Sequence, residues 1–489
     1  MKLIQTFLFL FSLSSISIVC AQNEADLFRY SKNYLGGSAR FEAMAGSFGA
    51  LGADISSFQV NPAGYGRFSH SSVGFGIYGG SQSTRTIFNT KQVERSQGQV
   101  APSTLGLVIT NDVSDKGNGF LFNQFSFGYQ QIDQFSRTLS YSGQQFSSLL
   151  DGFVDAAQGL NEEELNWYLP FSSDLAYKTH LMSFDPTQGA YVSELNSGDL
   201  IHNRTVNYSG GTGELYGAFS TNYMNKLYIG IKGGLRINRY NEEFIHTEQL
   251  VDTSNTDLRS FDYTYFLNTR GTGGNFSIGA VYLVSERLRT GLAVHSPTFY
   301  QLKDNWGSNM KGYFVDSTSQ LNEIEQPTGE YKYKLRTPTK ITASLAYIFG
   351  TKGCVNVDVD YIDYRHAHFR STSDINYASY SYESENLFAK EAFRNTVNIR
   401  IGGEYLVNNY FIVRAGLARY GKAFTNEQEA ELTADWITSC GFGIRIRNAS
   451  IDMSYRRLIQ TRNYYAFSGS TTETNDQNHR ITLSLNFLF

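Results

Sequence analysis

The sequence predicts an all-β protein, a transmembrane antiparallel β-barrel of about fourteen strands. Three observations support this fold class. Apolar and polar residues alternate with period two from about residue 71 to the last residue, and the gaps between the alternating segments are in turn long and short. The chain is also rich in aromatic residues and glycine, with 36 Phe, 33 Tyr and 45 Gly against 7 Pro. A large β-structure with one lipid-facing surface would have such a composition.

The alternation is clearest in the last nine residues. Every second residue from Ile481 to Phe489 is apolar, and Thr482, Ser484 and Asn486 lie on the opposite face. In a soluble sheet the apolar face would pack on a core, whereas in an outer-membrane barrel it faces lipid. A strand that ends the chain on an aromatic residue resembles the C-terminal recognition signal of bacterial outer-membrane barrels.

Fourteen segments are expected to be strands, near 71–81, 101–112, 121–140, 205–223, 227–246, 265–284, 287–299, 329–349, 353–370, 391–407, 409–421, 433–447, 448–464 and 477–489. The long gaps between them are 82–100, 141–204, 247–264, 300–328, 371–390, 422–432 and 465–476, and a short gap separates each long gap from the next. An up-and-down barrel with short periplasmic turns and long external loops requires this order.

The longest gap, 141–204, is expected to be a partly helical extracellular loop that caps the outer mouth. Helical spacing relates five of its apolar residues, Leu149, Leu150, Phe153, Val154 and Ala157. Asn161 with Glu164 offers a capping box before a further apolar stretch.

The period-two rule sorts the charged residues of the strands onto the face that would line the lumen. A charge on the lipid face near the membrane midplane costs about 2–4 kcal/mol, so a barrel requires this assignment. The charges could form a polar wall of paired groups, or some could contact a ligand. The candidate lumen charges are Lys232, Arg236, Asp358, Asp360, Arg400, Glu404, Arg414, Arg445 and Asp452.

Residues 1–21 are expected to be a secretory signal peptide. Lys2 precedes an apolar stretch, and Val19, Cys20 and Ala21 form a small-residue cleavage site before Gln22. A lipid anchor on Cys20 is disfavoured because Val19 is bulky for that signal. No later stretch reaches the roughly 18 apolar residues of a membrane helix. The formal net charge of −4 is too balanced to indicate a nucleic-acid partner.

The sequence gives no support for an enzyme. It contains no G-x-S-x-G motif, and the glycines of 271–275 lack the lysine and following helix of a phosphate loop. His366 and His368 share one face at the margin of a strand, where a metal or haem could bind, but we expect them to be incidental. We therefore expect no metal and no cofactor.

The segment SFGALGADISSFQVNPAGYG, residues 47–66, does not match the barrel pattern. It is too broken for a long helix and alternates too little for a strand. It contains Asn61-Pro62-Ala63-Gly64, which could be an ordinary turn before the first strand.

The stretch from Gly37 to Ala50, continued by Asn61-Pro62-Ala63-Gly64, resembles the N-terminal region of the FadL/TodX family of outer-membrane channels. Three further stretches agree with this resemblance: 279–300, 335–350 and 399–421. The likeness covers nearly all of the chain after the signal peptide and is strongest in the form typical of Bacteroidota.

The resemblance implies a fourteen-stranded barrel with an N-terminal hatch inside the lumen, in the outer membrane of a Gram-negative bacterium. Residues 22–68 would then be the hatch and residues 69–489 a multi-pass barrel surrounded by outer-membrane lipid. Small residues suit a segment that packs inside a barrel whose lumen is otherwise wide. Charged hatch residues could pair with wall charges: Arg40, Glu42, Asp54 and Arg67 with partners such as Arg400, Asp358 or Arg445.

The resemblance also implies passive uptake of a hydrophobic small molecule, of long-chain fatty acid or hydrocarbon type. The hatch would rearrange, and the ligand would leave sideways through a gap in the wall at a kink in the third strand. In this chain Gln130 and Gln131 interrupt the alternation of that strand, although a plain β-bulge would also explain this. The alternatives are a structural barrel subunit in a larger secretion or assembly complex with other outer-membrane proteins, or a general porin, which a hatch disfavours.

Overall fold

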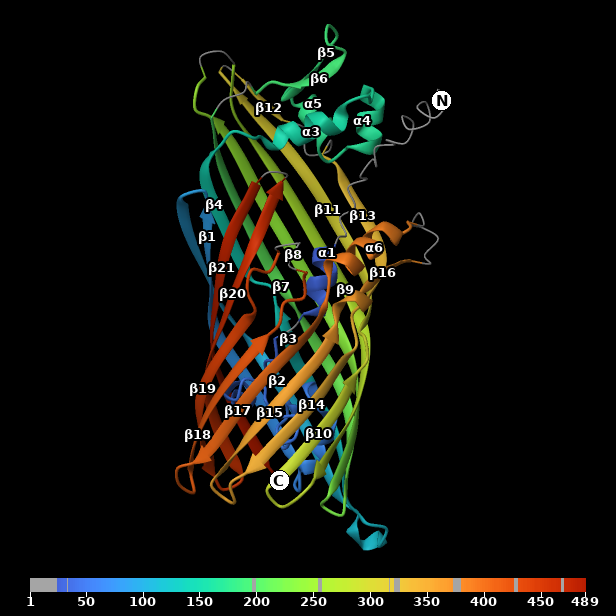
Figure 1. Ribbon diagram of the computed structural model, residues 1–489, viewed down its shortest axis with the longest axis vertical. Helices are drawn as coiled ribbons and strands as arrows, with labels where there is room; N and C mark the ends of the chain where they lie inside the picture. The colour runs from blue at the N-terminus through green and yellow to red at the C-terminus, as the bar shows by residue number, and fades with distance from the viewer. Residues whose placement is uncertain are drawn as a thin grey trace, which may run out of the picture.

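The wall of the molecule is a closed antiparallel β-barrel of fourteen strands, shown from the side in Figure 1. The first strand pairs with the second on one side and with the last on the other, which closes the sheet on itself. The computed structural model describes residues 24–32, 34–195, 199–253, 257–315, 317–320, 326–372, 380–425, 430–467 and 470–489. The predicted signal peptide, residues 1–21, lies outside the described residues.

Ten of the wall strands are continuous and four are made of two pieces. In order around the barrel they are β1 (Ser72–Phe88), β2 (Lys91–Asp112), β3 with β4 (Phe120–Gln134, Arg137–Gln145), β7 (Leu200–Tyr223), β8 (Leu227–Leu250), β9 (Leu258–Leu283), β10 with β11 (Leu288–His295, Phe299–Phe314), β13 with β14 (Thr328–Arg336, Lys340–Ile348), β15 with β16 (Gly353–Asp363, His368–Ser371), β17 (Asn395–Leu406), β18 (Phe411–Tyr420), β19 (Asp435–Ile446), β20 (Ala449–Phe467) and β21 (Ser470–Leu488).

Prolines explain two of the interruptions in the wall. Pro297 lies between β10 and β11, and Pro338 lies between β13 and β14. Proline has no N–H to donate to a ladder, so a strand is broken where it occurs. The two breaks face each other, and Thr298 N donates to Thr337 Oγ1 at 2.8 Å. In the next strand the short helix η5 (Tyr364–His366) separates β15 from β16.

The two faces of the wall differ as the alternation predicts. On β21, Ile481 and Leu483 are 46% and 49% exposed, whereas Thr482 and Ser484 are 0% and 2% exposed. The apolar side chains therefore point outward and the polar ones inward, which inverts the pattern of a soluble protein and suits a wall surrounded by lipid. The predicted alternation of this strand is confirmed.

Several of the expected long loops are in fact continuations of strands. The predicted gap 82–100 is a hairpin in which β1 and β2 stay paired up to Phe88 and Lys91. The predicted gap 300–328 begins with β11, which runs to Phe314 and pairs with the short strand β12 (Thr318–Gln320). Beyond the apolar band both faces of a strand can be polar, so the alternation disappears although the ladder continues. Boundaries drawn from the alternation were therefore too short there.

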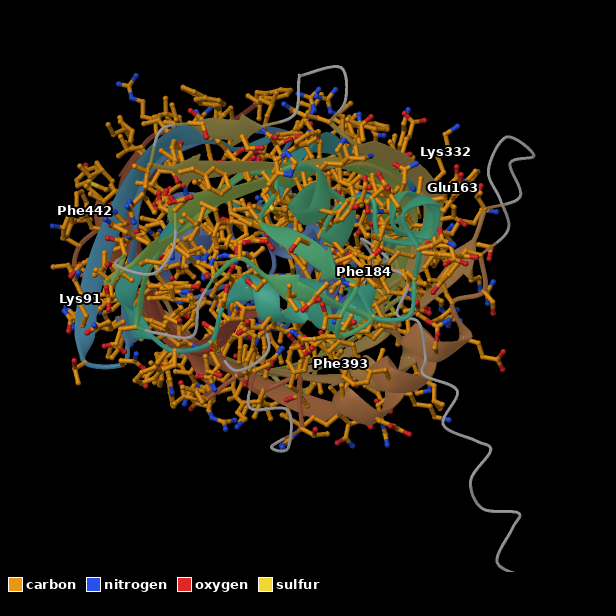
Figure 2. The ribbon with its side chains drawn as sticks, turned by 90° about the horizontal axis from the view of Figure 1, so that it is seen from above. Lys91, Glu163, Phe184, Lys332, Phe393 and Phe442 are labelled. Carbon is orange, nitrogen blue, oxygen red and sulfur yellow. The ribbon has the colours of Figure 1, made fainter. Side chains whose placement is uncertain are left out.

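The connection between β4 and β7 forms a cap at the upper end of the barrel in Figure 1. It contains α3 (Leu149–Ala157), α4 (Glu162–Tyr168), α5 (Ser173–Lys178) and the hairpin of β5 (Met182–Asp185) with β6 (Ala190–Ser193). The predicted capping box is confirmed, because Asn161 accepts from Glu164 N and Glu164 accepts from Asn161 N. The view from above in Figure 2 places Phe184 of the cap over the middle of the barrel.

Leucines join this cap to the wall. Leu150, Leu165 and Leu175 are fully buried in one cluster with Phe261 of β9 and Met310 of β11. Burial of a leucine side chain contributes about 1.5–3 kcal/mol. The cap is therefore packed on the upper wall of β9 and β11.

The N-terminal segment, meaning residues 24–32 and 34–68, lies inside the barrel. It forms α1 (Glu24–Ser31), α2 (Ala39–Ala43) and two 3-10 helices, η1 (Ser57–Gln59) and η2 (Pro62–Arg67). Phe41, Phe48, Phe58 and Tyr65 are at most 1% exposed. Within the described ranges, no helix is long and apolar enough to cross a membrane.

The wall is lower on one side, where β17, β18 and β19 end well below the tops of β20 and β21 in Figure 1. Helix α6 (Glu383–Ala392) lies there and contacts α1. Aromatic side chains from α1, β13, β16 and the neighbouring loops fill the space between them, among them Phe28, Tyr333, Phe369, Tyr382, Phe393 and Phe424. On this side packed loops and a helix replace the strands of the wall.

The last residue gives a testable prediction for barrel assembly. Phe489 N donates to Ser71 O at 3.0 Å, and the phenyl ring is 67% exposed beside the outward ring of Phe487. We expect Phe489→Asp to lower the amount of folded barrel in outer-membrane fractions, because it places a charge at the lipid-facing end of the closing strand. Heat-modifiable mobility on gels measures the folded fraction.

Phe146→Asp is the matched control, because Phe146 is also a strongly exposed aromatic residue but lies at the start of the cap, at the opposite end of the barrel from the C-terminus. Equal folded levels of the two variants would contradict the proposed importance of the terminal aromatic.

Candidate functional site

Asn61 ties the N-terminal segment together and fastens it to the wall. Its Oδ1 accepts from Ala63 N at 3.0 Å, which caps η2. Its Nδ2 donates to Gly49 O at 2.9 Å and to Ala280 O of β9 at 3.0 Å. Pro62 occupies the first helical position, where an N–H would have no partner in the helix. The candidate motif Asn61-Pro62-Ala63-Gly64 therefore forms a buried turn in direct contact with the barrel.

Inward-facing glycines let the backbone of this segment touch the wall. A Cβ on Gly279 of β9 would lie 2.1 Å from Asn61 Oδ1, and one on Gly230 of β8 would lie 2.4 Å from the carbonyl carbon of Pro62. Gly291 of β10 approaches Gly49 O in the same way, with a distance of 2.4 Å. Side chains cannot occupy such gaps, so glycine is required at these wall positions.

A second group of wall glycines packs closely against the end of α2. Gly402 of β17 and Gly416 of β18 are paired in register, and a Cβ on either would come within 2.5 Å of the Met44 backbone. A Cβ on Gly441 of β19 would lie 2.7 Å from the Cβ of Ala43. Small residues on both surfaces thus allow the segment to pack closely against β8–β10 and against β17–β19.

Arg400 is a buried charge of the wall that holds two carboxylates. Its guanidinium bonds Asp360, with Nη2 at 2.9 Å from Oδ1, and lies 3.7 Å from Asp358. Asp358 in turn accepts from Phe48 N at 2.9 Å and from Gly49 N. The sequence suggested that Arg400 and Asp358 could pair with charged hatch residues. Instead they pair with each other and with Asp360, and Asp358 binds backbone N–H groups of the segment.

A second network crosses from the segment to the wall near the lower end of the barrel. Arg40 bonds Glu404 at 2.8 Å, Arg414 Nε bonds the same carboxylate at 3.1 Å, and Arg414 Nη1 bonds Asp452 at 2.7 Å. Glu42 bonds Arg480 at 3.0 Å. In this region the segment thus contributes one cation, Arg40, and one anion, Glu42, to ion pairs with the wall, and removing one partner of a buried pair typically costs about 3–5 kcal/mol.

Three candidate lumen charges remain, Lys232, Arg236 and Arg445. Lys232 and Arg236 both bond Glu214 of β7. Arg445 is exposed at the lower mouth, where it lines a cavity with Arg40 and Asp452. Thus eight of the nine candidates form ion pairs, and Arg445 faces the lower opening.

Asp54 and Arg67 of the segment bind polar groups instead of wall charges. Asp54 accepts from Ser38 Oγ at 2.8 Å and from Ser56 N at 2.8 Å. Burial raises the pKa of Asp54, while nearby Arg40 and these hydrogen bonds act in the opposite direction. Arg67 Nη1 donates to Tyr228 Oη at 2.6 Å.

An aromatic cavity of about 520 Å³ lies between the cap and the upper wall, and we call it the outer cavity. Its lining includes Phe153, Phe171, Phe244, Tyr263, Tyr265, Trp306, Phe467 and Arg204. The Arg204 guanidinium packs 3.8 Å above the ring of Phe244. Its Nε and Nη1 have no hydrogen-bond partner in the described part of the chain. The outer cavity thus combines mostly apolar walls with one buried cation, and its lining also includes two exposed acids of α3, Asp151 and Asp155.

A second cavity of about 300 Å³ lies deeper in the lumen, and we call it the inner cavity. Its lining comes from α1, from the junction of β3 with β4 and from β20, and includes Phe28, Lys32, Phe135, Arg137, Arg462 and Tyr464. The lower mouth holds a separate cavity of about 350 Å³, lined partly by Arg40, Ala53 and Asp54. The N-terminal segment contributes to both of these cavities.

The wall strands β2 and β3 separate at Gln130. Their ladder ends at the Thr104–Gln130 pair, and from there upward β3 continues to pair with β7, with a register shift between Gln131 and Asp133. Gln130 Nε2 donates to Ser103 O at 2.9 Å and to Gly36 O at 3.2 Å. The candidate kink residues therefore lie at the upper end of a wall ladder, with Gln130 in contact with the N-terminal segment.

Sequence reasoning missed the wall glycines and Arg204. Gly230 shares the inward parity of Lys232, and Gly279 lies two residues from the buried Ser277, so glycines at inward positions could have been recognised from the alternation. Arg204 fell in the predicted external loop, because the strand β7 starts four residues before it.

These features define a β-barrel channel whose lumen is occupied by its own N-terminal segment. The sequence model of the outer membrane protein transport protein family (OMPP1/FadL/TodX) matches residues 218–485, more than half of the chain. The chain therefore belongs to the FadL/TodX family of outer-membrane transport proteins. It is accordingly an outer-membrane protein of a Gram-negative bacterium and a transport protein, not an enzyme.

Solved structures share the observed barrel fold. The Pseudomonas putida toluene transporter TodX matches with a TM-score of 0.53 and 13% identity, over 93% of this chain and 99% of that one. A Pseudomonas aeruginosa FadL homologue matches with a TM-score of 0.55 and 12% identity over the same shares. The CymD monoaromatic hydrocarbon channel matches at 0.50 and 12%, over 93% and 98%. A comparison with curated protein sequences finds no match.

The wall glycines can be tested with one pair of variants in β9. Gly279→Ala should displace Asn61 and destabilise the packing of the segment by about 1–3 kcal/mol, the usual cost of overpacking. Gly274→Ala is the control, because no atom lies within 4 Å of a Cβ at that position. Limited proteolysis of the folded barrel would detect release of the segment, and thermal unfolding would report the loss of stability. Equal behaviour of the two variants would contradict the packing role of Gly279.

Proposed function

We propose that the chain is a channel for passive uptake of hydrophobic compounds, of long-chain fatty acid or hydrocarbon type. The outer cavity carries this proposal, because a cavity of about 520 Å³ with mostly apolar walls suits a hydrophobic small molecule. The similar structures of a toluene transporter and a monoaromatic hydrocarbon channel support the same substrate class.

In this proposal residues 22–68, which include the N-terminal segment, act as a hatch in a barrel formed by residues 69–489. The ligand binds first beneath the cap, which belongs to the extracellular loop 141–204, and then in the inner cavity. A rearrangement of the hatch frees the path below. The support is the position of the segment, which lies between the inner cavity and the lower mouth and contributes residues to both.

Lateral release is proposed at the seam above Gln130. A hydrophobic molecule gains little from entering the periplasm, whereas lipid lies directly outside the wall. The seam is a suitable exit because β2 and β3 are not paired above Thr104 and Gln130. Gln130 also binds Gly36 O of the segment, so movement of the hatch could be coupled to this part of the wall.

Arg204 favours an amphiphilic acid over a plain hydrocarbon. A buried guanidinium with free N–H groups binds a carboxylate well, and hydrogen bonds to charged groups contribute about 1.5–3 kcal/mol. A fatty acid could place its chain along the aromatic wall and its carboxylate beside Arg204.

One observation favours the structural-subunit alternative. Trp167 and Phe146 of the cap are 81% and 79% exposed, and large exposed aromatic residues are common in protein interfaces. A partner outer-membrane protein could cover them. In that case hydrophobic uptake would be absent and removal of the barrel would disturb the complex.

Uptake of a labelled long-chain fatty acid and of a monoaromatic hydrocarbon tests the proposed function. In cells without another such channel, the wild-type protein should increase uptake. Arg204→Met should slow fatty acid uptake by about tenfold or more, since about 1.5–3 kcal/mol is lost, and should leave hydrocarbon uptake unchanged. Arg85→Met is the control, because Arg85 is an exposed arginine of β1.

No uptake of either compound by a barrel that is folded in the outer membrane would contradict the transport proposal and favour the structural-subunit alternative. Equal fatty acid uptake by the Arg204→Met variant and the wild type would contradict only the proposed role of Arg204.

A further inference from the structure

Two histidines and a glutamate form a buried cluster in the upper wall. His202 lies on β7, and His246 and Glu248 lie on β8. The strands pair His202 with Glu248, and His246 lies two residues away on the same face. All three residues are 0% exposed. The ladder thus fixes three groups that are good metal ligands at one point inside the barrel.

The ligand atoms are already close enough to share one ion. His246 Nε2 lies 2.9 Å from Glu248 Oε1, His202 Nδ1 lies 3.5 Å from the same oxygen, and the three ligand atoms are all within 4.8 Å of one another. Tetrahedral zinc has bonds of about 2.0–2.2 Å to nitrogen and oxygen, so neighbouring ligands are separated by roughly 3.3 Å. Small rotations of the imidazole rings would complete this geometry.

The histidines have nitrogen atoms without hydrogen-bond partners. Among the described residues, neither ring nitrogen of His202 has such a partner, and Nδ1 of His246 has none either. Buried polar groups in native proteins are almost always satisfied, and an exception calls for a specific explanation such as an unseen ion. A bound cation would supply the missing partner for His202.

The surrounding side chains would hold the ligands in place. Glu248 accepts from Ser148 Oγ and from Leu149 N, the first residues of the cap helix α3. The ring of Phe467 packs on both imidazoles, with centroids 5.8 Å from His202 and 5.7 Å from His246. Ser148, Leu149 and Phe467 also line the outer cavity. The cluster therefore lies directly behind that cavity and at the attachment of the cap.

We propose that His202, His246 and Glu248 bind a divalent transition-metal ion that fastens the start of α3 to the wall strands β7 and β8. Imidazole ligands suit zinc, copper, iron and nickel, and three protein ligands leave a fourth position for water. The carboxylate of Glu248 offsets part of the ionic charge. Arg204, paired with His246 in the ladder, places its guanidinium over Phe244.

The other histidine pair of the barrel provides a contrast. His366 and His368 lie at the junction of β15 with β16, and the His366 side chain is 70% exposed. His368 Nδ1 is 3.1 Å from His366 O, so it already has a backbone contact. His366→Gln is therefore a matched control that removes a histidine without touching the proposed site.

Refolding with zinc tests the proposal and does not depend on the transported compound. The full-length barrel would be purified through a tag without histidines, unfolded with chelator, and refolded in detergent with and without Zn²⁺. We expect one Zn²⁺ per chain after gel filtration and a higher unfolding temperature with zinc. His202→Gln and His246→Gln should each weaken binding by about 100-fold or more, since even indirect contacts of a metal site are worth about 10–100-fold.

His202→Cys serves as a second variant, because a thiolate is also a zinc ligand and should retain the zinc-dependent stabilisation. The His366→Gln variant should bind like the wild type. The proposal is wrong if the folded wild type retains no zinc, or if the two glutamine variants and the wild type bind it equally. Loss of zinc from the His366→Gln variant alone would also overturn it.

Discussion

The lumen of a fourteen-stranded barrel is wider than its own inward side chains can fill, and the rest of this structure depends on how that space is occupied. The N-terminal segment fills it with small residues and a few buried aromatic rings. Close approach is possible because the wall presents glycine where the segment backbone arrives, at Gly230 and Gly279 on one side and at Gly402 and Gly416 on another. Shape complementarity between two backbones thus determines where the segment can lie.

Buried polar groups fix the position of the packed segment against the wall. The wall carboxylate of Asp358 receives N–H groups of Phe48 and Gly49, and Arg400 holds that carboxylate in place. Arg40 reaches Glu404 from the other side of the segment. Because uncompensated buried charges are costly, these contacts oppose partial withdrawal of the segment. A ligand that moves the segment must therefore disturb a few defined contacts, which suits a gated path better than an open pore.

Much of this architecture could be predicted from the sequence, and the exceptions have physical causes. The alternation in Ile481–Phe489 identified a lipid-facing wall, and the capping box at Asn161 and Glu164 identified a cap helix. Strand ends were placed too early, as at Phe88, because most residues just before it are polar on both faces of the strand, so the alternation disappears although the inward side chains stay buried. The ion pairs could not be assigned, because the partner of Arg400 depends on the register of the β15–β17 ladder. His202 and His246 are separated by a long stretch of chain, and only the β7–β8 ladder brings them together.

The central claim is that the N-terminal segment, and not the cap, closes the lumen. Ion conductance of the folded barrel in planar bilayers tests it directly, with residues 24–68 deleted in one variant and cap residues 147–195 replaced by a short linker in another. The account predicts a large, weakly selective conductance without the segment, and low conductance both for the intact protein and for the variant without the cap. A folded barrel that lacks residues 24–68 and conducts no more than the intact protein would contradict it.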